Sequence, residues 1–121
     1  MDWVARGRDY EGDADFVSRH LNRDVARCSP ATPVDDVRAL VDRDGICVVV
    51  NDAGVVFGAA DAKSLDARQG ATAEAVMRPG ISTVRPSEER DKLDERLATR
   101  HVQRIVVTDL EGKLLGLYSP E

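Results

Sequence analysis

The side chains best suited to chemistry are two cysteines and two histidines, and their spacing fits neither a metal site nor a catalytic pair. Cys28 and Cys47 form no CxxC motif, and His20 and His101 form no HxxxH or HExxH motif, so a zinc site is not expected. Cys47 lies inside the apolar run ICVVV, which predicts a small buried core residue. We expect both thiols to be reduced. Nothing in the sequence favours Cys28 and His101 as a nucleophile and its base.

Motifs that carry enzyme chemistry are missing from the rest of the sequence. There is no paired-carboxylate motif, no nucleophile elbow and no phosphate-binding loop. The stretch GVVFGAADAK contains glycines but not the GxGxxG spacing. We therefore expect no catalytic activity and no catalytic residues.

The composition is typical of a soluble, cytoplasmic protein with one domain. The chain has 121 residues, of which 42% are hydrophobic and 32% charged, enough for a modest core. Its 17 basic and 22 acidic residues give a net charge of −5, so nucleic acid is not an expected partner. No apolar run approaches the roughly 20 residues that cross a bilayer, so no membrane association is expected. The first residues also lack the apolar stretch of a secretory signal.

The strongest signal in the sequence is an internal duplication. The segments CVVVNDAGVVFGAA and RIVVTDLEGKLLGLY each contain two β-rich runs around a four-residue turn. Gly112 and Gly116 follow Gly54 and Gly58 at the same distance of 58 residues (112 − 54 and 116 − 58). Each turn begins with an asparagine or aspartate and closes on a glycine, as turns with a positive φ require. The second glycine of each copy predicts a bulge or a close backbone approach, with simple packing as the alternative.

A helix is expected ahead of each hairpin. Thr32 and Ser87 are the predicted N-caps, with Pro33 as the first residue of the first helix. Aligning Pro33 with Pro86 makes the first copy five residues shorter between the proline and the turn (18 against 23), which predicts a first helix shorter by about one turn. Two short helices, AKSLDAR and one capped by Thr72, are expected between the copies.

The duplication predicts the fold. One β-α-β-β unit presents an apolar sheet face that its single helix cannot cover. Two units related by a pseudo-twofold axis can bury these faces against each other, which predicts a compact α/β (α+β) domain with clefts where the halves meet. We expect the first repeat over residues 22–71 and the second over 72–121, with residues 1–21 as an N-terminal tether.

This repeated pattern resembles a pair of cystathionine-β-synthase-type (CBS) domains, a Bateman module, as in stand-alone CBS-domain proteins of bacteria. The segment AVMRPGISTVRPSEERDKLDERLATRHVQRIVVTDLEGKLLGLY carries the most specific part of the resemblance, which covers about residues 22–119. The resemblance implies tandem β-α-β-β(-α) repeats and a regulatory ligand between them, such as AMP, ADP, ATP or S-adenosylmethionine. It also implies a homodimer formed through the helices, with room for an unidentified protein partner.

The ligand signature that the resemblance implies is altered in both copies. In the family pattern a glycine is followed by two apolar residues, Ser or Thr, two variable residues and Asp. Here Asp61 takes the hydroxyl position and Ser64 the carboxylate position, so Asp61 would repel phosphate unless Lys63 or a metal intervenes. In the second copy Ser119 takes the hydroxyl position, and the sequence stops at Glu121, before the aspartate position.

The resemblance nevertheless indicates which residues would surround a ligand. They are Ser82, Thr83 and Val84 on the lead-in strand, Arg100 and His101 at the helix end, Arg104 and Ile105 on the next strand, and Asp61, Lys63, Ser64 and Ser119 at signature positions. For the basic residues the alternative is a solvated edge, and for the hydroxyls it is local backbone hydrogen bonding. The alternative function is a dimerisation or protein-interaction module with a decayed nucleotide site.

Overall fold

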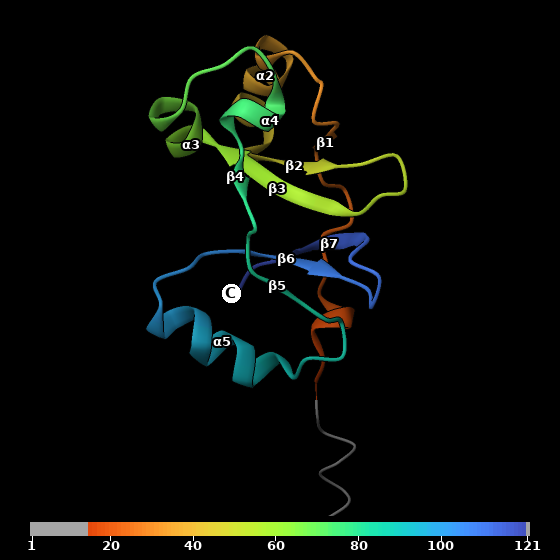
Figure 1. Ribbon diagram of the computed structural model, residues 1–121. Helices are drawn as coiled ribbons and strands as arrows, with labels where there is room; N and C mark the ends of the chain where they lie inside the picture. Colours follow the sequence, from red (N-terminus) through yellow and green to blue (C-terminus); the bar gives the residue numbers. More distant parts are fainter. Residues whose placement is uncertain (1–14, 121) are drawn as a thin grey trace, which may run out of the picture.

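The structure, a computed structural model, describes residues 15–120 and divides them into two stacked α/β halves (Figure 1). Most of the predicted tether, residues 1–14, and the terminal Glu121 lie outside the described residues. The elements are η1 (Val17–Arg19), β1 (Arg27–Cys28), α2 (Val34–Asp44), β2 (Ile46–Val50), β3 (Val56–Asp61), α3 (Ala62–Ala67), α4 (Ala73–Val76), β4 (Arg78–Pro79), β5 (Thr83–Val84), α5 (Arg90–Thr99), β6 (Ile105–Thr108) and β7 (Leu114–Tyr118). Within the described range, no helix has both the length and the apolar character needed to cross a bilayer.

Each half contains a small mixed sheet built in the same way. The strand order is β1-β2-β3-β4 in the first half and β5-β6-β7 in the second. β1 runs parallel to β2 with Arg27 opposite Val48, and β5 runs parallel to β6 with Thr83 opposite Val106. Both hairpins are antiparallel, and both have a register shift at the same place, after Val49 in β2 and after its counterpart in β6. The predicted α/β class and the duplicated hairpins are confirmed.

Two backbone hydrogen bonds between the hairpins flank the approximate twofold axis. The backbone N–H of Val56 donates to the carbonyl of Gly112, and that of Leu114 donates to the carbonyl of Gly54, both at 3.0 Å. The two donors are 58 residues apart (114 − 56), and so are the two acceptors (112 − 54). Because each bond is the symmetric copy of the other, the halves are related by the pseudo-twofold axis that the duplication predicts.

The segments that lead into the two halves cross between the sheets. Asn22 exchanges two backbone hydrogen bonds of 2.9 Å with Leu117 in the second half before the chain enters β1 of the first. In the same way β4 pairs with β3 before the chain enters β5 of the second half. Glycines permit this: a Cβ at Gly58 would lie 2.3 Å from the carbonyl oxygen of Arg78, and one at Gly116 would lie 2.7 Å from that of Asn22. The close backbone approach predicted for these glycines is confirmed.

In the part of the chain that the structure describes, three apolar clusters form the core. One lies between the sheets and joins the halves through Val48, Val106, Leu114 and Leu117. The outer face of the first sheet is covered by α2, α3 and α4, and that of the second by α5 and η1 (Figure 1). As predicted, Cys47 is fully buried in the first outer cluster. Leu93 and Leu97 form the buried stripe of α5. Val17 of η1 is also fully buried, against α5 and the second sheet.

The two long helices begin later than predicted. Pro33 rather than Thr32 is the N-cap of α2, and the hydroxyl oxygen of Thr32 accepts a 3.0 Å hydrogen bond from the backbone of Ser29 instead. Glu89 rather than Ser87 is the N-cap of α5. Neither cap residue makes a side-chain capping hydrogen bond. The two short helices between the copies form where they were predicted, over α3 and after Thr72.

Bridges to distant residues explain these helix starts. Pro33 forms an isolated bridge with Thr72, and Glu89 forms the equivalent bridge with Phe16, so both residues are held in extended backbone until the helix begins. The pairing also shows that Pro33 corresponds to Glu89 and not to Pro86. The alignment of the two prolines was therefore wrong.

The first helix is not shortened. α2 has 11 residues and α5 has 10, which contradicts the prediction of a missing turn. The extra residues of the second copy lie instead after its helix, where residues 100–104 separate α5 from β6 while Gly45 alone separates α2 from β2. This longer connection matters for the site, because it carries several of the residues predicted to contact a ligand.

Candidate ligand-binding site

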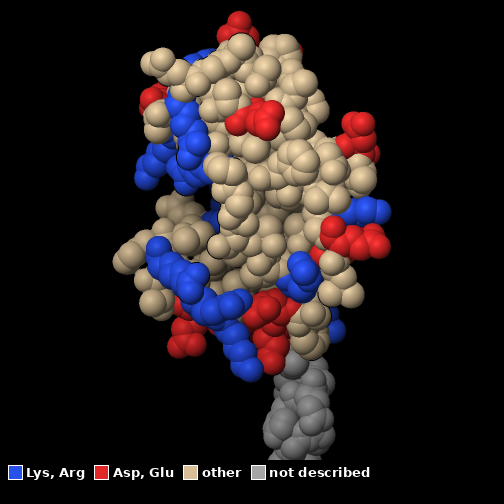
Figure 2. Space-filling model, in the orientation of Figure 1, with Lys and Arg blue, Asp and Glu red and all other residues tan. Residues whose placement is uncertain are grey.

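A cavity of about 630 Å³ lies between the two halves, beside the connection that follows α5. Its walls come from the end of β3 and the start of α3 in the first half, and from the lead-in to β5, residues 100–104 and β6 in the second. Figure 2 shows a hollow on this side of the molecule, with Lys and Arg side chains above and below it.

Seven of the predicted site residues line this cavity: Asp61, Lys63, Ser82, Arg100, His101, Arg104 and Ile105. Ser119 lines a second, smaller cavity. Ser64, Thr83 and Val84 line neither of the two. Val84 packs against the outer cluster of the second half, and Ser64 is buried at the start of α3.

Asp61 and Ser64 form a reciprocal capping box at the start of α3. The backbone N–H of Ser64 donates to Oδ1 of Asp61 at 2.9 Å, and the backbone N–H of Asp61 donates to the hydroxyl oxygen of Ser64 at 2.9 Å. Asp61 and Ser64 stand in exchanged order relative to the family signature, and in this order they cap the start of α3. The spacing Asp-x-x-Ser ahead of a short helix is a sequence signal that could have indicated this cap.

Arg78 is a cavity residue that the sequence did not single out. Its guanidinium donates to Oδ1 of Asp61 at 3.2 Å, so the carboxylate that would repel a phosphate already has a cationic partner. The pairing of Arg78 with Ala59 across β4 and β3 holds its backbone at the cavity wall. A lone arginine before a proline carries no periodic or motif signal, which is why only the fold reveals it.

The connection after α5 turns sharply toward the cavity. Arg100 is the C-cap of α5, and His101 follows with a φ of 58°, a left-handed conformation that is uncommon for a residue other than glycine. Its counterpart in the first half is Gly45, with a φ of 85°. The backbone N–H of Val102 donates to the carbonyl of Leu97 at 2.9 Å and closes the turn. Residues 100–104 thus reach the cavity from a helix end that is fixed by backbone bonds.

Arg104 stands at the boundary between the halves. Its Nη2 donates to the carbonyl oxygen of Gly45 at 3.3 Å, across 59 residues of sequence. Arg104 and Ile46 line both the larger and the smaller cavity. A ligand that draws Arg104 toward one cavity would therefore change the wall of the other.

The charged residues of the larger cavity are predominantly basic. Among residues 15–120, Lys63, Arg78, Arg100 and Arg104 line it together with a single carboxylate, Asp61. Since Arg78 is paired with that carboxylate, three cationic side chains remain to attract an anion.

The smaller cavity, of about 240 Å³, is the symmetry mate of the larger one. Ser119 occupies the place of Asp61 (119 − 61 is 58), and Leu117 that of Ala59. Its charged lining includes two carboxylates, Asp24 and Asp44, beside Arg104. The two cavities thus differ in both volume and charge, and the larger one is better suited to an anionic ligand.

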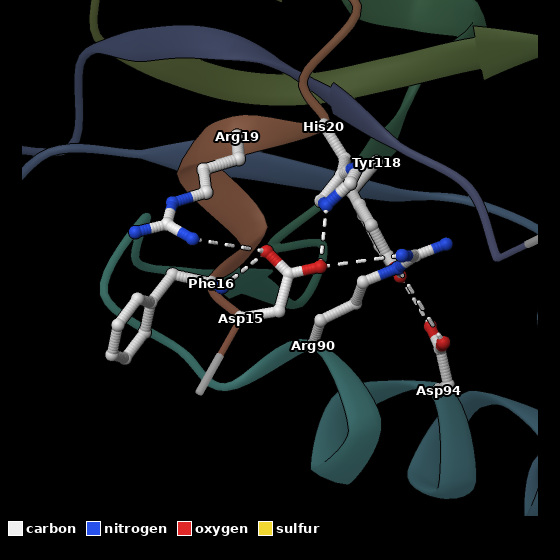
Figure 3. A network of polar contacts seen from close by, with 7 residues as sticks. All are labelled: Asp15, Phe16, Arg19, His20, Arg90, Asp94 and Tyr118. Atoms are coloured by element: carbon white, nitrogen blue, oxygen red, sulfur yellow. Dashed lines mark hydrogen bonds and ion pairs between the residues drawn. The ribbon is translucent and has the colours of Figure 1, made fainter. Parts of the chain in front are cut away.

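A polar network around Asp15 fixes the N-terminal segment to the second half (Figure 3). Nε2 of His20 lies 2.7 Å from Oδ2 of Asp15, and Arg90 donates to the same oxygen at 3.3 Å; these hydrogen bonds hold the pKa of Asp15 below its ordinary value. Arg90 also donates to the hydroxyl of Tyr118, which in turn donates to Asp94. Burial raises the pKa of Tyr118 and keeps this donor protonated. Because His20 lines the smaller cavity, the network reaches its wall.

The described residues contain no group of three His, Cys, Asp or Glu side chains placed to hold a metal ion. Cys28 lines neither cavity, whereas His101 lines the larger one.

Comparison with known proteins identifies the fold. No protein-family model matches the chain. The crystal structure of CBSX2 in complex with AMP superimposes with a TM-score of 0.79 at 22% sequence identity, over 86% of this chain and 89% of that one. The chain folds as a CBS domain pair.

Other CBS domain structures agree. The CBS domain of the bacterial CNNM/CorC family Mg²⁺ transporter, solved in complex with ATP, gives a TM-score of 0.71 at 21% identity over 86% of this chain and 80% of that one. The CBS domain pair of protein MJ0100, in complex with 5′-methylthioadenosine and S-adenosyl-L-methionine, gives 0.75 at 14% identity over 88% and 90%. The larger cavity of the present CBS pair lies between its two repeats, as the sequence resemblance implied.

Proposed function

We propose that this CBS pair is a regulatory module that binds an adenosine-containing nucleotide in the larger cavity. The observation that carries the proposal is the composition of that cavity, which combines four basic side chains with an apolar wall between the repeats. Structures with this fold were solved in complex with AMP, with ATP, and with 5′-methylthioadenosine and S-adenosylmethionine, which supports the ligand class.

The phosphates would lie against the connection after α5 and the start of α3. Arg100 and Arg104 offer planar guanidinium groups that can donate two hydrogen bonds to one phosphate, and Lys63 adds a third charge from α3. His101 adds a ring nitrogen to the same wall. All four side chains belong to exposed residues and can therefore reorient toward a ligand.

The base would lie against the apolar part of the wall. Ile46 and Ile105, together with Ile81 on the lead-in segment, present partly buried branched side chains there. The hydroxyl of Ser82 and the amide of Gln103 can hydrogen-bond the edge of a purine. Because Asp61 is engaged with the cap and with Arg78, we place no carboxylate on the ribose, and phosphate contacts should dominate the affinity. This ranks AMP, ADP and ATP above S-adenosylmethionine, whose sulfonium would face the basic wall.

Regulation follows if the ligand favours one arrangement of the two repeats over another, because a ligand shifts an equilibrium only by its difference in affinity. The cavity includes residues of both repeats, so occupancy would bear on their relative position. The proposal has four further parts. The protein would form a homodimer through its helices and act on an unidentified protein partner. It would be located in the cytoplasm and have no catalytic activity.

Isothermal titration calorimetry with AMP, ADP, ATP and S-adenosylmethionine tests the proposal. We expect binding of at least one nucleotide, and Arg104→Gln should weaken it about tenfold because a charge-assisted contact to phosphate is lost. Arg38→Gln is the matched control, since Arg38 is exposed on α2 and lines neither cavity. If no ligand at millimolar concentration gives heat or a thermal shift, the proposal is wrong.

The alternative is a dimerisation or protein-interaction module with a decayed site. The capping box favours it, because Asp61 and Ser64 serve α3 rather than a ligand. This alternative predicts a dimer whose stability does not respond to nucleotides. A monomer in sedimentation velocity at tens of micromolar would contradict it.

A further inference from the structure

Two thiols face each other in the first half of the molecule. Cys28 ends β1 and Cys47 lies in the neighbouring parallel strand β2, and their Sγ atoms are 3.1 Å apart although 19 residues separate them in sequence. A disulfide bond has an S–S length of about 2.05 Å, so the two sulfurs need to approach by roughly 1 Å. Side-chain rotation within a pair of hydrogen-bonded strands can supply this movement.

The two thiols differ in their access to solvent. Cys47 is fully buried within the outer cluster of the first half. Cys28 is half-buried and lies between two exposed residues, Arg27 and Ser29. A soluble oxidant therefore reaches Cys28 first, and Cys47 can react only with a group on Cys28.

The hydrogen bond between the thiols gives them different acidities. Cys47 donates its S–H to the sulfur of Cys28, which stabilises the thiolate of Cys28 and lowers its pKa. The same hydrogen bond, together with burial, raises the pKa of Cys47. The accessible thiol is thus also the better nucleophile.

We propose that Cys28 and Cys47 form a reversible oxidation site that closes as an intramolecular disulfide. With hydrogen peroxide as oxidant, the thiolate of Cys28 attacks one peroxide oxygen, the O–O bond breaks, and the products are a sulfenic acid and, after protonation of the leaving hydroxide, water. The sulfur of Cys47 then attacks the sulfenic sulfur, the S–O bond breaks and a second water leaves with the proton of Cys47. A dithiol reductant reverses the reaction by thiol–disulfide exchange.

The disulfide would brace the lead-in segment of the first repeat. It would close a loop that contains the whole of α2, and it would tie β1 covalently to β2. The residues just before β1, namely Asp24, Val25 and Ala26, line the smaller cavity, and Ala26 accepts a 2.9 Å hydrogen bond from Val48 of β2. Oxidation would therefore hold one wall of that cavity in place.

The test is oxidation of the 121-residue protein with equimolar hydrogen peroxide. We expect the intact mass to fall by about two units, for the two thiol hydrogens, with a cross-linked peptide containing Cys28 and Cys47 and full reversal by dithiothreitol. Closing the loop should raise Tm by about 5–10 °C. The disulfide should also form at least about tenfold faster in the folded protein than in denaturant, since only the fold brings the sulfurs together.

Two variants separate the roles of the thiols. Cys47→Ala should lose the two-unit mass change and accumulate sulfenic or sulfinic acid at Cys28, whereas Cys28→Ser should leave a buried thiol that native alkylation does not modify. Recovery of two free thiols from wild-type protein treated with peroxide would overturn the proposal. A disulfide between two chains, or equal rates of disulfide formation in the folded and unfolded states, would also overturn it. The wild-type measurements decide the matter even if a variant fails to fold.

Discussion

At the scale of single residues, Asn51 and Asp109 stabilise equivalent turns, one with a side-chain amide and the other with a carboxylate. Each side-chain Oδ1 accepts hydrogen bonds of 2.9 Å from the backbone N–H groups two and four residues further along the chain. The backbone hydrogen bonds, led by that from Lys113, hold the pKa of Asp109 below its ordinary value. The amide of Asn51 makes the same contacts and does not titrate in this range.

This difference predicts a pH effect that one substitution removes. A carboxyl group whose pKa is lowered on folding contributes stability above its unfolded pKa and loses that contribution as the pH falls through the folded value. The advantage of wild type over Asp109→Asn in free energy of unfolding should therefore be present at pH 5 and shrink below about pH 4. Urea denaturation at several pH values measures it.

The first turn supplies the matched control for that experiment. Asn51→Asp should introduce the same acid sensitivity at the symmetry-related place, because the backbone donors are already there. If the free energies of unfolding of wild type and Asp109→Asn stay parallel from pH 5 to pH 2, the carboxylate of Asp109 does not contribute to the pH dependence of stability.

At the scale of elements, the antiparallel pairing of β4 with β3 depends on Gly58, a position without a side chain. A Cβ at Gly58 would meet the backbone oxygen of Arg78 at 2.3 Å, and backbone cannot move aside as a flexible side chain can. Gly58→Ala should therefore lower the free energy of unfolding by about 2–3 kcal/mol or more. It should also disturb the larger cavity, because Arg78 lines it.

Gly54 provides the comparison. Its φ is 86°, and a Cβ there would meet nothing within 4 Å, so Gly54→Ala should cost only the conformational strain of about 1 kcal/mol. Chemical denaturation of both variants separates crowding from backbone strain. Equal costs for the two substitutions would contradict the close-approach explanation.

At the scale of the whole molecule, neither repeat is complete without the other. Each sheet pairs with a lead-in segment that continues into the opposite half, and the cluster around Val48 and Val106 draws on both sheets. We therefore expect fragments 22–71 and 72–121 to remain unfolded separately. Far-UV circular dichroism and thermal melts of each fragment test this, and a cooperative transition in either fragment alone would contradict it.

The pseudo-twofold axis relates two cavities that the side chains make unequal. The larger has four basic residues in its lining, and the smaller has Asp24 and Asp44 beside the shared Arg104. The longer connection after α5 adds to this difference, because it contributes residues 100–104 to the larger cavity. Symmetry of the backbone thus does not imply two equivalent ligand sites.

The sequence by itself determined the features that depend on neighbours along the chain. The two hairpins follow from β-rich runs around turns that end in Gly54 and Gly112. The repetition of this strand-turn-strand pattern predicts two halves related by a twofold axis. The stripe of α5 at Leu93 and Leu97 was also predictable, because helical periodicity is local.

Only the tertiary structure decided the features that depend on contacts between distant segments. The start of α5 is set by a bridge from Phe16 to Glu89, and no pattern near Ser87 records that bridge. The pairing of Arg78 with Asp61 and the contact between two sulfurs likewise join residues that are far apart in sequence. The physical reason is the same in each case: propensity and periodicity act over a few residues, whereas the partner of a backbone or side-chain group is chosen by how the two halves pack.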